Sequence, residues 1–367
     1  MFRCGRGIAR TLVLALSASA LTGTSVTVTP TPASAAGTVL FDQPFHNNTA
    51  NGTGSVVLPA MPSGSGTTNF ACLTASGNIT TGVLRSCSGN LDSQGSGKLR
   101  LTNTATSKAG GVFGATSVPT SQGLDVTFNT YQYGGTAADG LGFVLAAVDP
   151  ANPQSPANLG QLGGGLGYTS TSNLSGMAYG YLGIGLDVYG NFSNSTYQGS
   201  GCTNPPYIGT GGTRVPGQIV VRGPGNGTVG YCAINSTASS TSATALALRA
   251  TTRTAVPVQV GVNPTNTVLT TTAGMTIPAG SYKVVVTLVG GTTRTLTGTL
   301  PTVPTGLYPA SWLNSNGIPR QLVFGWVGST GAVTDFHEVD EAEVATISAV
   351  PQLTVAQTSY NATTLQA

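Results

Sequence analysis

The sequence predicts an all-β protein in which antiparallel sheets form a sandwich. Short runs alternate between apolar and polar residues, as residues 123–133 (GLDVTFNTYQY) illustrate, and a period of two is typical of strands with one buried face. Gly occurs 52 times and Ser, Thr and Asn are frequent, which suits the many turns between short strands. No long segment shows helical periodicity. These observations together favour one large β-sandwich.

The expected strands follow one another along most of the chain. Residues 46–96 interrupt them as a long polar segment, and residues 141–148 are apolar throughout, as a central strand between two sheets would be. Gly290 and Gly291 separate two alternating runs, which predicts a two-residue hairpin. The full set of expected strands covers residues 39–45, 98–103, 111–113, 123–133, 141–148, 181–188, 218–222, 257–262, 282–289, 294–300, 321–327 and 335–347.

The two ends of the chain differ from the sandwich between them. Three arginines precede an apolar run at residues 11–21, and small residues follow at 33–35, a pattern typical of a secretory signal peptide. We therefore expect a signal peptide at residues 1–35 and one β-domain at residues 36–349. Residues 350–367 are expected to be a linker or the first part of a further β module. No later run supplies the roughly 20 apolar residues of a membrane span.

Charge excludes several classes of function. Three of the 14 Lys and Arg residues lie in the expected signal peptide. The rest of the chain then has 11 Lys and Arg residues and 11 Asp and Glu residues. No basic surface is therefore expected to attract nucleic acid or anionic membrane. The chain has only two His residues, so a Ser-His-Asp arrangement has almost no candidates, and no phosphate-binding lysine motif is present.

Four cysteines follow the leader: Cys72, Cys87, Cys202 and Cys232. An even number in an exported chain indicates two disulfides, and sequence proximity favours Cys72–Cys87 and Cys202–Cys232. A zinc site made of four cysteines is the alternative, but the chain contains no CxxC pair. Disulfides are therefore the preferred interpretation.

Several fragments, taken in order, resemble the L-type (legume-type) lectins, with the bacterial secreted branch as the nearest match. The resemblance covers about residues 38–348 and implies a concanavalin-A-like jelly-roll sandwich that binds sugars in a shallow depression at its rim. The family's last, specificity-determining loop corresponds to residues 328–331. The fragments are ADGLGFVLAAVDP (138–150), GGGLGY (163–168), GIGLDVYGNFSN (183–194), QLVFGWVGSTG (321–331) and HEVD (337–340).

The resemblance implies a sugar-binding role for four residues. Asp139 matches the family aspartate that accepts hydrogen bonds from sugar hydroxyls, and Gly164 matches a backbone N–H donor. Asn191 matches the residue whose amide contacts the sugar, and Tyr189 the aromatic residue that lies against it. The family pattern also implies a cis Ala138–Asp139 peptide bond, which is rare outside proline.

The resemblance also implies a calcium site at Asp187, the Tyr189 carbonyl, Asn191 and Asn194. Calcium takes about six to eight oxygen ligands, several of them charged. Legume lectins usually have Asp where Asn194 stands and Glu where Gly185 stands. We therefore expect at most one weak calcium site and no manganese-type site.

An acidic motif supports an alternative function. Glu338, Asp340 and Glu343 match the Glu-x-Asp-x-x-Glu signature of laminarinase-type glycoside hydrolases, which share the jelly roll. The two glutamates would be the nucleophile and the general acid/base, about 5–5.5 Å apart, and a β-bulge would have to bring them onto one face. Because only Trp312 and Trp326 are available for stacking on a glycan, we favour a charged outer face and expect no catalytic residues.

The sequence therefore predicts a secreted or cell-surface glycan-binding module, part of a larger adhesion or surface protein. Its partner would be carbohydrate, with no nucleic acid and no membrane span. The alternative hypotheses are a glycoside hydrolase and a structural sandwich whose sugar site has decayed. The residues leave the identity of the sugar and the oligomeric state open.

Overall fold

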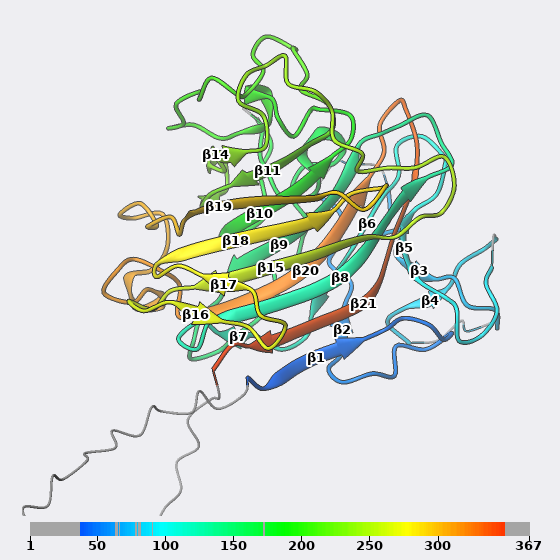
Figure 1. The fold of residues 1–367 in the computed structure, drawn as a ribbon, viewed down its shortest axis with the longest axis horizontal. Coiled ribbons are helices and arrows are strands. Elements are labelled where there is room, and N and C mark those ends of the chain that lie inside the picture. Colours follow the sequence, from blue (N-terminus) through cyan, green and yellow to red (C-terminus); the bar gives the residue numbers. More distant parts are fainter. Residues whose placement is uncertain are drawn as a thin grey trace, which may run out of the picture. The chain divides into compact units, whose positions relative to one another are not determined.

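Two sheets packed face to face make up the fold (Figure 1). The structure is a computed structural model that describes residues 37–348, apart from residues 63, 64, 66, 78, 80, 81, 90 and 172. The expected signal peptide and the segment at residues 350–367 lie outside the described residues. Nearly all strand pairs are antiparallel, and the predicted all-β jelly-roll sandwich is confirmed.

The first sheet contains nine strands and includes the last strand of the domain. The N-terminal half of that strand pairs with β5 and its C-terminal half with β1. In order across the sheet the strands are β19 (Thr293–Thr299), β18 (Ser281–Thr287), β15 (Val256–Asn263), β8 (Leu124–Tyr133), β21 (Phe336–Thr346), β5 (Leu99–Thr102), β3 (Cys72–Leu73) and β4 (Arg85–Ser86), with β1 (Val39–Gln43) beside β21.

The second sheet contains ten strands and carries the rim described below. In order its strands are β13 (Val229–Gly230), β12 (Gly225–Asn226), β10 (Gly180–Asp187), β9 (Gly140–Ala147), β20 (Gln321–Ser329), β6 (Ala109–Gly114) and β2 (Val56–Val57). Beside them lie β11 (Gln218–Arg222), β14 (Ala233–Ser236) and β7 (Val118–Pro119). The small elements are β16 (Leu269–Thr270), β17 (Thr276–Ile277) and the 3₁₀ turns η1 (Gly163–Gly165), η2 (Ser195–Tyr197) and η3 (Ala310–Trp312).

The main core lies between the two sheets and centres on Trp326, which is fully buried. Its ring is 5.7 Å from the rings of Phe41, Phe128, Phe143 and Phe324, centroid to centroid. The strands of both sheets alternate so that one face of each supplies these apolar side chains.

A second apolar layer explains why residues 141–148 are apolar throughout. On the outer face of the second sheet, Val144 and Val323 pack under loops that carry Tyr168 and Tyr231, whose rings are 5.5 Å apart. Strand β9 is therefore buried on both faces, as expected. However, loops rather than a further sheet cover one of those faces.

The connections agree with most of the sequence-based expectations. Both disulfides are present with the expected pairing, Cys72–Cys87 and Cys202–Cys232. Strands β18 and β19 form the expected hairpin, but its connection spans residues 288–292 rather than two residues. Gly290 and Gly291 both adopt positive φ (93° and 86°) inside this longer loop. None of the described helices is long and apolar enough to cross a membrane.

Candidate functional site

Three strand ends meet at one rim of the second sheet. Asp139 directly precedes β9, and because β9 runs antiparallel to its neighbours, it lies beside the ends of β10 and β20. The Asp139 N–H donates to the carbonyl of Ser329 at 2.8 Å, and its carbonyl accepts from the Tyr189 N–H at 2.9 Å. Antiparallel pairing thus unites the Ala-Asp-Gly fragment with two segments that lie far away in the sequence.

The Asp139 carboxylate is buried and incompletely hydrogen-bonded. The residue is 3% exposed, and no group in the described chain donates to its Oδ2 atom. A Cβ added to Gly331 or Gly163 would lie 3.2 Å or 3.5 Å from Oδ2, so two bare backbones flank this oxygen. Burial, together with the nearby charge of Asp187, raises the pKa of Asp139 to about 7. Such an oxygen can accept hydrogen bonds from a ligand's hydroxyl groups.

The Ala138–Asp139 peptide bond corrects one expectation, because none of the described peptide bonds is cis. Ala137 takes a left-handed conformation instead, with φ of 74°. The change of chain direction before Asp139 therefore includes a residue with positive φ, an uncommon conformation for a non-glycine residue.

The glycine-rich turn packs directly on the Asp187–Asn194 segment. Gly164 lies in η1 and is buried. A Cβ at Gly164 would lie 2.2 Å from the Cβ of Asn191 and 2.8 Å from the ring of Tyr197, so only glycine allows this close approach. The structure therefore brings Gly164 and Asn191 together, and it places η1 beside Asp139 through Gly163.

Tyr189 and Asn191 are both half-buried at this rim. The guanidinium of Arg214 lies over the Tyr189 ring, 4.0 Å from its centroid. The Asn191 carbonyl accepts from the Asn194 N–H at 3.0 Å, which closes the turn. Both side chains are accessible enough to contact a ligand, but the arginine covers one face of the tyrosine ring.

The Asp187 carboxylate, the first expected calcium ligand, is buried and already has several donors. Its Oδ1 accepts from the Gly190 N–H at 2.8 Å. Its Oδ2 accepts from the N–H and the hydroxyl of Ser193, both at 2.8 Å. Burial raises the pKa of Asp187 to about 6, although these hydrogen bonds act to lower it. The carboxylate thus serves as the internal anchor of its own loop.

Asn194 and the Tyr189 carbonyl, two of the other expected ligands, also have partners within the protein. Asn194 accepts from the Thr196 N–H at 2.8 Å and donates to the Thr213 carbonyl. The Tyr189 carbonyl accepts from Arg214 at 3.5 Å, so a positive group occupies its free side. Among the described residues no group of three or more His, Cys, Asp or Glu side chains is arranged to hold a metal. Three of the four expected ligands are thus already hydrogen-bonded within the protein, and the segment does not offer the roughly six to eight free oxygens that a calcium ion needs.

Gly185 occupies the position where the resemblance implied a metal-binding Glu in related lectins. The ring of Phe192 packs against it, because a Cβ at Gly185 would lie only 2.4 Å from that ring. Phe192 is 1% exposed and belongs to the outer apolar layer. A phenyl ring thus fills the space beside β10 that a longer side chain would need.

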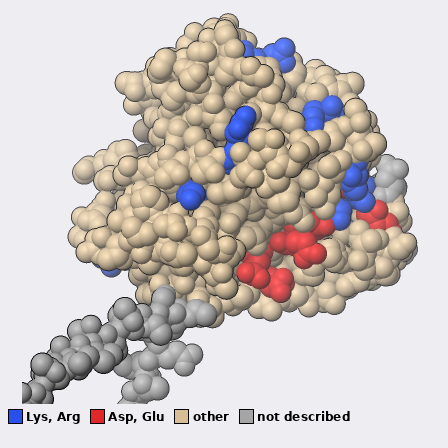
Figure 2. Space-filling view, in the orientation of Figure 1, with Lys and Arg blue, Asp and Glu red and all other residues tan. Residues whose placement is uncertain are grey.

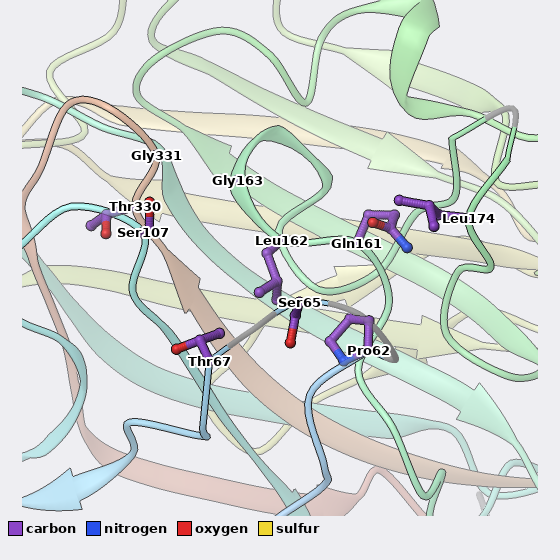
Figure 3. Close-up of a pocket in the computed structure, with 10 residues that line it drawn as sticks. All are labelled: Pro62, Ser65, Thr67, Ser107, Gln161, Leu162, Gly163, Leu174, Thr330 and Gly331. Atoms are coloured by element: carbon purple, nitrogen blue, oxygen red, sulfur yellow. The ribbon is translucent and has the colours of Figure 1, made fainter.

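A hollow of about 350 Å³ is lined by Gly163 and Gly331, among other residues (Figure 3). It shares Gly163 and Gly331 with the surroundings of the Asp139 carboxylate. Figure 3 shows Gly331 and Thr330 on one side of the hollow and Leu162 and Gln161 on the other. The remaining lining residues are Pro62, Ser65, Thr67, Ser107 and Leu174.

The acidic motif in β21 lies elsewhere, on the outer face of the first sheet. The pairing passes from Asp340↔Asn129 to Glu343↔Thr127, so a bulge is present and Glu341 takes φ of 47°. The bulge brings Glu338, Asp340 and Glu343 onto one face. Figure 2 shows acidic side chains gathered in one area of the surface beside Lys and Arg side chains.

Basic side chains hold two of the three motif carboxylates. Glu338 is fully buried, and its oxygens accept from Arg100 at 2.8 Å and from Arg253 at 2.6 Å. Asp340 is 3% exposed and accepts from Lys98 and from the Tyr131 hydroxyl. A nucleophile or general acid must reach the substrate, whereas these carboxylates are directed at internal cations.

Solved structures of lectins resemble this chain at low sequence identity. The Ca²⁺/Man-bound form of the VIP36 exoplasmic/lumenal domain is 14% identical, covers 86% of this chain and 94% of its own, and has a TM-score of 0.40. Lectin II from Ulex europaeus is 16% identical, with 80% and 97% covered and a TM-score of 0.40. Peanut lectin is 16% identical, with 80% and 98% covered and a TM-score of 0.37. No protein-family model and no curated protein matches the sequence.

The sequence-based expectations missed two features of this rim. The polar segment at residues 46–96 contributes Pro62, Ser65 and Thr67 to the hollow, and no local pattern predicts this long-range contact. Arg222 was counted only as the end of a strand. Arg222 could have been noticed in the sequence, because a charged residue follows the apolar run Ile-Val-Val in a chain with only 7% charged residues.

Proposed function

We propose that this chain is a glycan-binding module whose primary site is the rim at Asp139. The observation that carries this proposal is the buried Asp139 carboxylate, whose Oδ2 lacks a donor and is flanked by Gly163 and Gly331. A buried acceptor without a partner is costly, and a sugar with neighbouring hydroxyl groups supplies the missing donors. The two glycines let a sugar ring approach closely.

The remaining residues of the rim support this use. Gly164 holds η1 against Asn191, whose half-buried amide can donate to and accept from hydroxyl groups. The exposed part of Tyr189 offers an apolar surface for a sugar ring. The hollow beside Gly163 and Gly331 provides room for a second sugar unit. The proposed ligand is therefore a neutral glycan, bound mainly through its hydroxyl groups.

A glycan array tests the proposal directly. The parent protein is expected to bind a defined group of neutral glycans. Absence of binding to every glycan would instead favour a structural sandwich with a decayed site.

Replacing Gly164 with Ala is expected to weaken glycan binding by about tenfold or more, equivalent to about 1.4 kcal/mol. The new Cβ displaces Asn191 and Tyr197, because it would lie 2.2 Å from the Asn191 Cβ. Calorimetric titration with the best glycan from the array measures the effect. Gly89→Ala is the matched control, because a Cβ there meets nothing within 4 Å. Equal affinity of both variants would contradict the placement of η1 at the site.

Glycoside hydrolysis is the second candidate, and the bulge in β21 is the observation in its favour. We propose that Glu338 is a structural ion-pair partner rather than a catalytic group. Glu338→Gln is expected to destabilise the fold by about 2–3 kcal/mol, because it removes the buried negative charge that accepts from both Arg100 and Arg253. Chemical denaturation measures this loss. Reducing-sugar release by the parent that disappears in Glu338→Gln would establish the hydrolase instead.

We further propose that the protein acts outside the cell or at its surface, as part of a larger adhesion or surface protein. Two disulfides fit an oxidising compartment, and the pattern at residues 1–35 is that of a secretory signal. N-terminal sequencing of the exported protein is expected to begin near residue 36.

A further inference from the structure

Arg222 is a fully buried cation that binds three backbone carbonyls. It lies at the end of β11, paired with Gly183 of β10. Its Nε and Nη2 donate to the Phe192 carbonyl at 3.0 Å and 2.7 Å, and Nη2 also donates to the Asn194 carbonyl at 2.8 Å. Nη1 donates to the Tyr231 carbonyl at 2.8 Å. Two of these three carbonyls belong to the rim segment 187–194.

This arrangement is unusual because the charge is compensated by carbonyl dipoles. The ion pairs formed by the described residues do not include Arg222. Its guanidinium lies 5.0 Å from the centre of the Phe192 ring, and the charge of Asp187 acts to keep it protonated against the effect of burial. Buried charges are expensive and persist where the surroundings pair or hydrogen-bond them.

The same segment is the one from which the resemblance implied calcium ligands. Asp187 already accepts three hydrogen bonds from its own loop, and the Phe192 ring fills the space beside Gly185. A guanidinium is planar, carries up to five N–H donors and stays charged over the physiological pH range. It can therefore gather several carbonyls around one positive centre, as a metal ion would.

We propose that Arg222 takes the place of a bound metal ion and holds the segment 187–194 in its ligand-binding conformation. Arg222 is thus a positioning residue: it acts on Asn191 through the carbonyls of Phe192 and Asn194, which follow Asn191 in the chain, and does not touch the ligand. One consequence, which rests on the proposed function, is that glycan binding by this chain does not require calcium. The bracing of the loop itself does not rest on that function.

Calcium titration of the parent protein is the first test. No binding heat is expected up to about 10 mM calcium, above the range of about 0.1–1 mM in which extracellular modules bind. The melting temperature is expected to be the same in calcium and in chelator, and so is the affinity for the best glycan. Saturable calcium binding that raises the melting temperature, or loss of the glycan in chelator, would overturn the proposal.

Hydrogen exchange in Arg222→Met is the second test. The amides of Gly190 and Ser193 are expected to exchange about tenfold faster or more, while those of β15 in the first sheet keep their protection. Arg320→Met, which removes an exposed arginine, is the control and should leave both sets unchanged. Equal acceleration in both sheets, or unchanged exchange at Gly190 and Ser193, would show that Arg222 does not brace the loop specifically.

Calcium titration, the melting temperatures and hydrogen exchange need no sugar, so they decide the inference even when the array finds no ligand. If Arg222→Met does not fold, the calcium titration of the parent remains decisive. If the array finds a ligand but chelator releases it, the proposed function stands and the role of Arg222 falls.

Discussion

Replacing Asp139 with Asn is expected to abolish glycan binding and, at pH 8, to stabilise the fold by about 1–3 kcal/mol. The parent carries a buried carboxylate whose Oδ2 has no donor. The amide removes that charge at nearly constant volume, and it also removes the anionic acceptor that the sugar hydroxyls require. Chemical denaturation and calorimetric titration measure the two effects on the same samples.

The stabilisation is expected to depend on pH. The pKa of Asp139 is raised from 3.8 to about 7 in the folded chain, so between these values the folded state holds a proton that the unfolded state has lost. The contribution of Asp139 to the stability of the parent therefore falls as pH rises from about 4 to about 7 and is then constant. The advantage of Asp139→Asn should grow over this range, and glycan binding by the parent should weaken as pH falls below about 7.

Asp42→Asn is the matched control, because Asp42 is exposed on β1. Asp42→Asn is expected to change neither the affinity for glycan nor the way in which the free energy of unfolding depends on the titration of Asp139. An Asp139→Asn protein that is less stable than the parent at pH 8 would show that the carboxylate is satisfied within the fold.

Replacing Trp326 with Ala is expected to cost about 3–5 kcal/mol of unfolding free energy. Trp326 is fully buried where the two sheets meet, and its ring is 5.7 Å from each of four phenylalanine rings. The loss combines the transfer of the indole to water with the cavity left behind. Denaturant titration followed by circular dichroism measures it.

Trp312→Ala supplies the comparison, because Trp312 is only half-buried and its ring contacts Tyr179 near η3. We expect Trp312→Ala to lower the free energy of unfolding by less than half as much as Trp326→Ala. Equal costs for the two tryptophans would contradict the assignment of Trp326 to the centre of the core.

Local patterns were sufficient for most of the fold. Alternation in residues 123–133 predicted β8, because one face of that strand packs on the core and the other faces outward. The spacing of the cysteines predicted both disulfides. The hairpin of β18 and β19 was predicted but with too short a loop, because Gly290 and Gly291 both sit inside a wider turn.

For the candidate site, the resemblance pointed to single residues, Asp139 and Gly164. The structure places both at one rim, Asp139 before β9 and Gly164 in η1. The internal partners of Asp187 and Asn194 were not predictable, because backbone donors such as the Gly190 N–H leave no sequence pattern. The role of Arg222 depends on carbonyls from two distant loops, which only the folded chain brings together.

Glycan-array binding by the parent, by Asp139→Asn and by Asp42→Asn tests the central claim most directly. The parent and Asp42→Asn are expected to bind the same neutral glycans. Asp139→Asn, although folded and more stable, is expected to bind none of them. Undiminished binding by Asp139→Asn would contradict a sugar site at this rim.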